Sequence, residues 1–486
     1  MRWKRVTGVT LVLCGLAASA AQAAPAQAAP QGLPEDLGLS VVRTVCDLVW
    51  VDAVCQPAAY TDPLYRTTTE PHPGTALQQR IGVLHEHSGY SDGDPTQRPA
   101  DYFRAAKTGH NTADAGGDTG IIVDYLMSSE HSENEKLPVT TAEVCLDPAA
   151  ALTCVNALQA DHYRKWEETL KQANAATDRF LGGYTGFTGM RGFEFTNDYY
   201  NHLGVYLGRN VKNAKIDGSY LTTEAFWSWL RTAPTKGGGS DALVVFNHPG
   251  GLPGLTPFDD SAIIGPLLQS TIGGANWHDY AYVPDVDEQV SGIEVNRGDD
   301  LTWYVKALTN GWHLGPIAAE DEHQREWSTS DDGKTVMLTR GRSPQDYYWA
   351  LQHNRTMALG ADVVNGAPGQ PAVYPSVVFW ADGTSVNAAG AAPLGSRLVG
   401  GSHSLELDAS GLAPGSRAVL MNKAGGPPVA LGTAAADGKI RSTSAVAAPA
   451  TGEGWWFVVI CGADSTSCGQ DELYDVVTSP IWVRAA

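Results

Sequence analysis

The stretch Leu84-His85-Glu86-His87-Ser88-Gly89-Tyr90-Ser91-Asp92-Gly93 places two histidines at positions i and i+2. It directly follows the apolar residues 81–84, a short run that is compatible with a buried strand. Alternate side chains of a strand point to the same side, so His85 and His87 can bind one cation from the strand end. Taken alone, such a pair is more simply explained as two surface histidines. Further His, Glu and Asp residues end other apolar runs along the chain, and this repetition favours a metal-dependent hydrolase with several ions.

Short apolar runs alternate with helix-like segments between residue 77 and about residue 359. Strands are predicted at 81–87, 191–195, 202–207, 242–248, 292–295 and 315–319. Helices are predicted at 99–107, 161–176, 223–231, 300–310 and 344–359. This alternation indicates an α/β fold with a parallel sheet or barrel. Most candidate ligands end the predicted strands, where barrels of this kind form their active sites.

The composition changes after about residue 371, where short β-like runs are separated by Gly, Pro, Ala and Ser. This pattern predicts a small antiparallel β-sandwich. We therefore divide the chain into a signal peptide (1–28), a leader with one cysteine loop (29–76), the α/β barrel (77–370) and a β-sandwich accessory domain (371–486).

The first residues have the pattern of a secretory signal, with the basic Met1-Arg2-Trp3-Lys4-Arg5, an apolar segment and Ala26-Gln27-Ala28 as a cleavage site. We expect an exported protein with no membrane span after cleavage. Six cysteines then remain, as three closely spaced pairs, and local disulfides are expected in an exported chain. These pairs are Cys46/Cys55, Cys145/Cys154 and Cys461/Cys468.

The chain carries 53 acidic and 33 basic residues, for a net charge of −20. An acidic surface repels phosphate backbones, which argues against general nucleic-acid binding. The sequence also lacks a G-x-S-x-G elbow, a Walker loop and an H-E-x-x-H motif, so several other hydrolase classes are excluded. The oligomeric state is left open.

The ordered set of motifs resembles the PHP (polymerase and histidinol phosphatase) superfamily over about residues 77–359. The matching segments are the H-x-H with its Ser91-Asp92-Gly93, Ser129-Glu130-His131 in place of T-D-H, Gly192-Phe193-Glu194-Phe195, His202-Leu203-Gly204-Val205, Phe246-Asn247-His248-Pro249 and Glu320-Asp321-Glu322-His323. The second motif departs from the family pattern, which leaves the role of Glu130 undefined.

The resemblance implies a distorted barrel of seven strands that binds two to three divalent transition-metal ions. One ion would be bound by His85, His87, Glu194 and Asp321. A second would share Glu194 and add His202 and His248, and a third would be bound by Asp92, His131 and His323. Mixed imidazole and carboxylate ligands suit Zn²⁺, Mn²⁺ or Fe²⁺.

The implied activity is hydrolysis of phosphate monoesters or diesters by a hydroxide that bridges the metals, with Glu194 and Asp321 central to catalysis. Glu294 and Arg297 end another predicted strand and either face the substrate or form an ion pair within the barrel. Arg325, His353 and Arg355 are candidate phosphate contacts, although a solvated helix face is the preferred interpretation of His353. Two alternatives stay open at this point: a metal-dependent hydrolase of amides or lactones, and a binding protein without catalysis.

Overall fold

The computed structural model describes residues 64–111, 120–135, 165–198, 200–216, 219–249, 275–296, 300–329, 332–423, 427–465, 467–469 and 474–486. The predicted signal peptide, most of the predicted leader and the pairs Cys46/Cys55 and Cys145/Cys154 lie outside these residues. Leu64–Leu137 and Lys165–Ala486 belong to one compact unit, which contains all of the described residues. The predicted boundary between residues 370 and 371 falls inside this unit.

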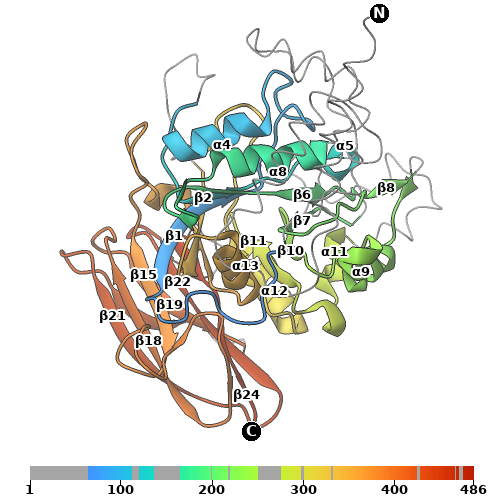
Figure 1. Ribbon diagram of the computed structural model, residues 1–486. Coiled ribbons are helices and arrows are strands. Elements are labelled where there is room, and N and C mark those ends of the chain that lie inside the picture. Colours follow the sequence, from blue (N-terminus) through green and yellow to red (C-terminus); the bar gives the residue numbers. More distant parts are fainter. Residues whose placement is uncertain are drawn as a thin grey trace, which may run out of the picture. The chain divides into compact units, whose positions relative to one another are not determined.

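The first part of the unit is α/β (Figure 1). Its main helices are α4 (Pro99–Thr108), α5 (Ser132–Glu135), α8 (Lys165–Ala176), α9 (Thr223–Arg231), α11 (Ala275–Tyr280), α12 (Asp300–Asn310) and α13 (Pro344–Gln352). Its strands are β1 (Gln78–Leu84), β2 (Tyr125–Met127), β3 (Arg179–Phe180), β4 (Gly183–Tyr184), β5 (Thr188–Met190), β6 (Gly192–Phe195), β7 (Leu203–Tyr206), β8 (Lys215–Ile216), β9 (Ser219–Tyr220), β10 (Leu243–Phe246), β11 (Val290–Glu294), β12 (Gly315–Ile317), β13 (Lys334–Thr339) and β14 (Thr356–Leu359).

Most strands of this part pair in two mixed sheets, and β3-β4 and β8-β9 form two separate antiparallel pairs. One sheet has the order β12-β11-β10-β7-β6, in which β7 runs antiparallel to both of its neighbours. The other contains β14-β13-β1-β2-β5, in which β1 is parallel to β2 and antiparallel to β13. The α/β class predicted from the sequence is confirmed, whereas an all-parallel sheet is wrong.

The strong periodic segments were located correctly from the sequence, and α9 and α12 have the predicted bounds. The helix predicted at 344–359 is wrong after Gln352. Its start is defined by a capping box between Ser343 and Asp346. Its end is followed by Asn354, whose φ of 50° is left-handed and whose side chain donates to the carbonyls of Ser291 and His313. The remaining residues form β14.

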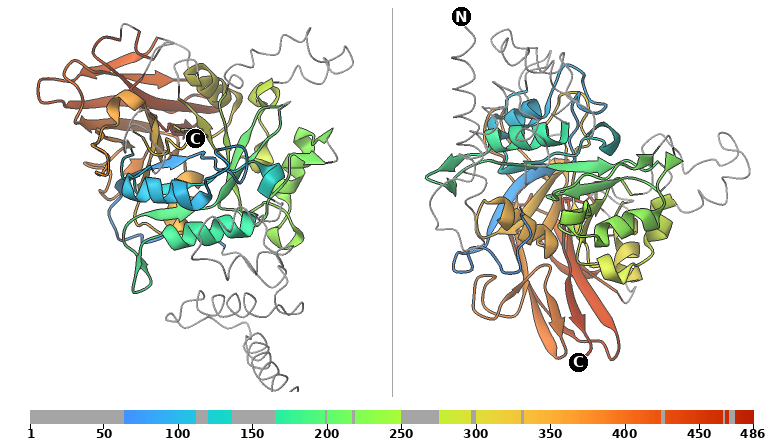
Figure 2. Two further views of the ribbon diagram at one scale, coloured as in Figure 1. Left: turned by 90° about the horizontal axis from the view of Figure 1, so that it is seen from above. Right: turned by 45° about the vertical axis from the view of Figure 1, so that its right-hand side comes forward.

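The C-terminal strands form two layers that share one core (Figure 2). The bounds are β15 (Ser376–Ala381), β16 (Ala392–Pro393), β17 (Arg397–Val399), β18 (Ser402–Ser410), β19 (Arg417–Asn422), β20 (Val429–Thr433), β21 (Ile440–Ala447), β22 (Glu453–Cys461), β23 (Val476–Thr478) and β24 (Ile481–Arg484). One layer is β16-β15-β18-β21, and the other contains β17, β24, β22 and β23 with β19 and β20. All of these pairs are antiparallel except β17 with β24.

The second C-terminal layer is continuous with the sheet of the first part. β23 pairs with β22 on one side and with β14 on the other, with Met357 opposite Thr478. Buried side chains of β1, such as Ile81 and Val83, belong to the same core cluster as Val458 and Ile460 of β22. The C-terminal strands therefore complete the core of the part that carries the candidate ligands.

Two further predictions concern the environment of the chain. The predicted disulfide Cys461–Cys468 is confirmed, with a Cα–Cα separation of 5.7 Å. No helix in the described part of the chain is both long and apolar enough to cross a lipid bilayer.

Candidate metal centre

The H-x-H segment delivers two buried imidazoles to one point. β1 ends at Leu84, and His85 and His87 are both fully buried. Their Nε2 atoms lie 3.1 and 3.2 Å from the same oxygen, Oδ1 of Asp321. Asp321 is held beside them because its N–H donates to the carbonyl of His85 at 3.0 Å. The two histidines thus converge as predicted, although both lie beyond the end of β1 and His85 has a left-handed backbone with a φ of 75°.

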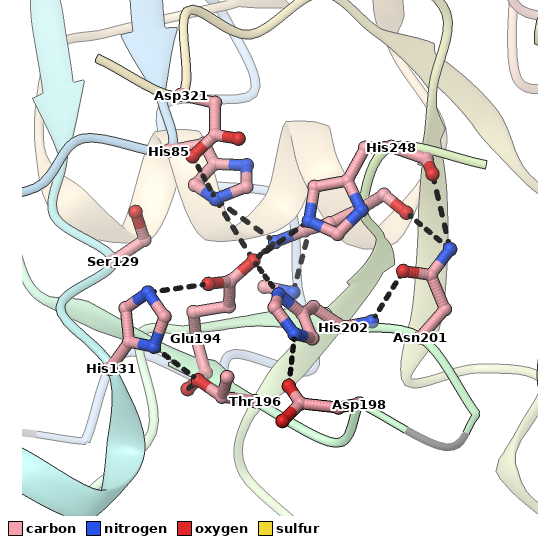
Figure 3. Close-up of polar contacts among 12 residues, drawn as sticks. His85, Ser129, His131, Glu194, Thr196, Asp198, Asn201, His202, His248 and Asp321 are labelled. Carbon is pink, nitrogen blue, oxygen red and sulfur yellow. Dashed lines mark hydrogen bonds and ion pairs between the residues drawn. The ribbon is translucent and has the colours of Figure 1, made fainter. Parts of the chain in front are cut away.

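Glu194, at the end of β6, is the centre of the cluster (Figure 3). Its Oε1 lies 3.0 Å from Nε2 of His85, 3.2 Å from Nδ1 of His202 and 3.3 Å from Nε2 of His248. Its Oε2 lies 3.5 Å from Nε2 of His131. The side chain is 1% exposed, so these imidazoles dominate its surroundings.

The third predicted ligand group also comes together. Oδ1 of Asp92 lies 3.3 Å from Nε2 of both His131 and His323, and 3.5 Å from Nδ1 of His87. Asp92 is half exposed, whereas Glu194 is buried. The cluster therefore has one open side, which is the side of Asp92, and one closed side.

All nine predicted ligands form one connected network. Three groups of their ligand atoms are compact enough to hold an ion: His87, Asp92, His131 and His323; His85, His87 and Asp321; and His85, Glu194 and His248. His87 belongs to two of these groups, a sharing that the sequence did not indicate. The division of these ligands among ions stays a prediction.

Several of the imidazoles have one ring nitrogen in contact with a second polar group, which fixes the orientation of the ring. Nδ1 of His85 is 2.6 Å from Glu294, Nε2 of His202 is 3.1 Å from Asp198, and Nδ1 of His323 is 2.8 Å from the carbonyl of Asp321. These partners only accept, so the facing ring nitrogen carries the proton and the opposite nitrogen keeps its lone pair. Orientation of this kind is typical of metal-binding histidines.

Glu294 is therefore placed beside a ligand rather than at the open side of the cluster. Besides contacting His85, its Oε2 accepts the backbone N–H of His248 at 2.6 Å. The other candidate from this strand end, Arg297, lies outside the described residues.

In the cluster, carboxylates face imidazole rings, and this pairing together with burial shifts the pKa values of several histidines. Burial opposes protonation of His202, yet Glu194 and Asp198 raise its pKa to about 10. Burial also opposes protonation of His323, and Asp92 together with Asp321 raises its pKa to about 9. Burial lowers the pKa of His87 to about 4. His202 and His323 thus favour a positive charge, and a divalent cation can supply that charge in place of the second ring proton.

The distances fit cation ligands. Donors that bind one ion at about 2.1 Å lie about 3.0 to 3.4 Å apart in octahedral or tetrahedral geometry. The facing nitrogen and oxygen atoms of this cluster lie mostly 3.0 to 3.5 Å apart. In addition, the buried Nε2 of His87 has no hydrogen-bond partner among the described residues. The donor set and its spacing therefore suit divalent transition metals.

Sequence reasoning missed three residues that support the cluster. Asp198 contacts His202, Thr196 contacts Nδ1 of His131 at 3.0 Å, and Asn247 donates to Oε1 of Glu194 at 2.8 Å. Asn247 and Thr196 immediately precede or closely follow ligands in the chain, and this proximity was the available signal. Asp198 gave no signal of its own.

Glu130, which departs from the family motif, contacts the serines of the segment that follows the H-x-H motif. Its carboxylate accepts from the backbone N–H of Ser88 at 3.1 Å and from the hydroxyls of Ser88 and Ser91, at 2.5 and 2.6 Å. It is fully buried and belongs to none of the three compact groups of ligand atoms. Glu130 therefore stabilises the loop that carries Asp92.

Each candidate phosphate contact has a partner outside the nine ligands, although Arg325 lies near the open side, because the N–H of its partner Asp94 donates to the carbonyl of His323 at 3.1 Å. Arg325 is paired with Asp94 at 2.5 Å. Arg355 is paired with Glu70, and His353 stacks on Trp349 with ring centroids 3.8 Å apart. Trp312 and Trp327 are 1% exposed and pack in the core.

Comparison with known proteins gives few matches. No protein-family model matches the chain, and no curated protein has a significant match. Among solved structures, the chain is similar to a two-domain protein from Bacteroides vulgatus described as containing a predicted PHP-like metal-dependent phosphoesterase. That match has 14% identity and a TM-score of 0.36, and it covers 86% of this chain and 99% of the other.

An engineered protein is a weaker match, at 10% identity and a TM-score of 0.16, over 85% of this chain and 94% of the other. At these identities and TM-scores neither match assigns a fold or an activity, so the proposed function depends on the geometry of the cluster.

Proposed function

We propose that this chain is a secreted metal-dependent phosphoesterase of the PHP type, with a distorted β/α barrel that hydrolyses phosphate monoesters or diesters at a site for two to three ions. The observation that carries the proposal is the convergence of nine ligand-type side chains in one cluster centred on Glu194, at cation-ligand spacing. The H-x-H motif and the repeated strand-end motifs support the same family.

The residues divide into ligands and orienting groups. Zn²⁺, Mn²⁺ or Fe²⁺ would be held by the six histidines with Asp92, Glu194 and Asp321. When bound, such ions lower the pKa of a coordinated water and neutralise charge on phosphate oxygens. Glu294 and Asp198 hold the Nδ1 proton of His85 and the Nε2 proton of His202, so that the opposite nitrogens face Glu194 as lone pairs.

The open side of the cluster is the side that substrate would approach. Asp92, Asp321 and His323 have side chains 50%, 31% and 27% exposed, whereas His85 and Glu194 are closed off. Buried ligands in a dry environment keep their geometry, and exposed ones leave room for a phosphate group. A small phosphorylated substrate is therefore favoured over a nucleic-acid duplex, which agrees with the acidic charge of the chain.

The test is a substrate panel assayed with the full chain before and after chelation and after addition of each metal. We expect hydrolysis of an aryl phosphate or a diaryl phosphate that is lost on chelation and restored by Zn²⁺, Mn²⁺ or Fe²⁺. Carboxyl esters, amides and lactones are included in the same panel. A metal-loaded protein that hydrolyses only one of those substrates would refute phosphoester hydrolysis while keeping the metal centre.

Export is proposed on the N-terminal signal pattern and agrees with the disulfide between Cys461 and Cys468. N-terminal sequencing of the protein from the culture medium of its native host tests this part. A mature chain that begins near residue 29 is expected, and an intact Met1 would contradict it.

A further inference from the structure

A second polar pocket lies between the end of α13 and the start of the C-terminal layers. Its volume is about 610 Å³, which is within the range of ligand pockets. Four separate parts of the chain line it: residues 66–68, Glu288, Trp349 with residues 352–355, and residues 391–398 without Leu394. The pocket contains none of the nine candidate metal ligands. It does contain His353 and Arg355, which the sequence had suggested as phosphate contacts.

The position of this pocket separates it from the metal centre. The carbonyl of Arg355 accepts the N–H of Leu338 at 2.9 Å, and Leu338 lies opposite Gln79 near the start of β1. The ligand His85 comes six residues after Gln79, just beyond the end of the same strand. At about 3.3 Å per residue, the positions of Gln79 and His85 are about 20 Å apart along the strand. A small molecule in the pocket therefore does not reach the metal ligands.

The charge of the pocket is opposite to that of the protein. Its lining includes three arginines, Arg66, Arg355 and Arg397, and one carboxylate, Glu288. The whole chain has a net charge of −20. A local excess of arginine on an acidic protein attracts anions to that place.

The nearby carboxylates Glu70 and Asp287 offset part of this positive charge, but each of them is shared with a second side chain. The carboxylate of Glu70 contacts Arg355 but also Arg340, so one anion serves two cations. Arg66 donates to a neutral carbonyl, that of Ser240, at 2.9 Å. Arg397 has Asp287 at 3.6 Å, and His313 contacts that same carboxylate more closely, at 2.7 Å.

We infer that this pocket is a second binding site, for a small oxyanion such as a phosphate or carboxylate group. Arginine binds both groups through two parallel N–H donors. Gln352 adds an amide to the lining, and Trp349 adds an indole against which a ring attached to the anion can pack. The inference does not depend on the proposed function, because it concerns binding at the other end of the strands.

The experiment measures binding of inorganic phosphate, succinate and phenyl phosphate to the metal-loaded full chain by calorimetry. The test variant is the double substitution Arg66→Gln/Arg397→Gln. The control is Arg441→Gln, which also removes an arginine charge but from an exposed side chain of β21. Circular dichroism and metal content establish that each variant is folded.

We expect the double variant to lose one anion site per chain, or to bind at that site at least about tenfold more weakly, since charge-assisted hydrogen bonds have about this effect. The control should change affinity less than twofold. Binding of phosphate without binding of succinate would identify a phosphate site, and equal binding of both anions would identify a general oxyanion site. Tighter binding with phenyl phosphate would support contact with Trp349.

A second variant is expected to change the anion affinity in the opposite direction. Glu288 is exposed, and Glu288→Gln removes the only carboxylate in the lining, so anion affinity at this site should increase severalfold. If no anion binds, or if the double variant and Glu288→Gln both bind like the unmodified chain, the inference is wrong. Hydrolysis at the metal centre should be unchanged in all three variants, so failure here is distinct from failure of the proposed function.

Discussion

The substitution Glu194→Gln tests the metal centre most directly. The side chain keeps its size and its ability to coordinate through one oxygen, but it loses its negative charge. In the structure this charge faces His85, His202 and His248 through Oε1 and His131 through Oε2, at 3.0 to 3.5 Å. No other carboxylate of the cluster lies so close to four imidazoles in the described part of the chain.

The expected loss follows from these distances. One unit charge at about 3.2 Å from another is worth ~5 kcal/mol at an effective dielectric constant of about 20. Every ~1.4 kcal/mol is about tenfold in rate. A loss of ~10³-fold in kcat is therefore expected, which is also the scale observed when a central electrostatic group is removed from an active site. Metal content should fall at the same time.

The assay combines kcat on an aryl phosphate, metal content per chain and Tm. The matched control is Glu406→Gln on β18, where the carboxylate accepts from Ser404 at 2.6 Å and Thr443 at 2.7 Å, away from the cluster. Glu406→Gln should retain full turnover. A folded Glu194→Gln protein with full metal content and near-normal kcat would refute the reasoning.

Four further outcomes are expected. Glu294→Gln should weaken metal affinity or turnover by about 10- to 100-fold, because it removes the group that orients His85, and unchanged values in a metal titration would contradict that role. In the folded, chelated protein the pKa values of His202 and His323 are raised to about 10 and about 9. The stability that these two groups confer is therefore full below the unfolded pKa of about 6.5 and is lost as the pH rises toward 9 and 10. A Tm of the chelated protein that stays constant from pH 6.5 to 10 would be inconsistent with this. Peptide mapping without reduction should recover Cys461 linked to Cys468, and Cys468→Ser should lower stability by about 2–3 kcal/mol in denaturant titration, whereas a free thiol at Cys461 in the unmodified protein would contradict the pairing. A chain that ends at Gly360 should fail to fold, because it lacks β22 and β23, and a soluble, cooperative unfolding transition of that fragment would show that the C-terminal strands are dispensable.

Several of the ligands could be predicted from the sequence because they lie at the end of a buried apolar run, and the spacing of the family motifs located the others. Ile81-Gly82-Val83-Leu84 before His85 and Phe193 before Glu194 carry this information locally. The supporting residue Asp198 could not be predicted, because its role depends on the fold of a loop that brings it 3.1 Å from His202.

The same limit explains the errors in the fold. β2 and β5 have three residues each, which is too short to establish a periodicity. β13 (KTVMLT) is buried at every residue, including the charged Lys334, which pairs with Glu320. Its sequence therefore does not alternate between polar and apolar residues. The pairing of β14 with β23 joins residues more than a hundred positions apart, and no local pattern specifies it.

The position of β1 has a consequence for the kinetics of folding. β1 is synthesised early, but its antiparallel neighbour is β13, with Gln78 opposite Thr339, and β14 must then receive β23. Contacts over such sequence separations slow folding and leave strand edges unpaired in the meantime. The edge of β1 beside its H-x-H segment therefore stays unpaired until most of the chain has been made. We expect refolding to be slow and dependent on protein concentration, with aggregation as the competing reaction.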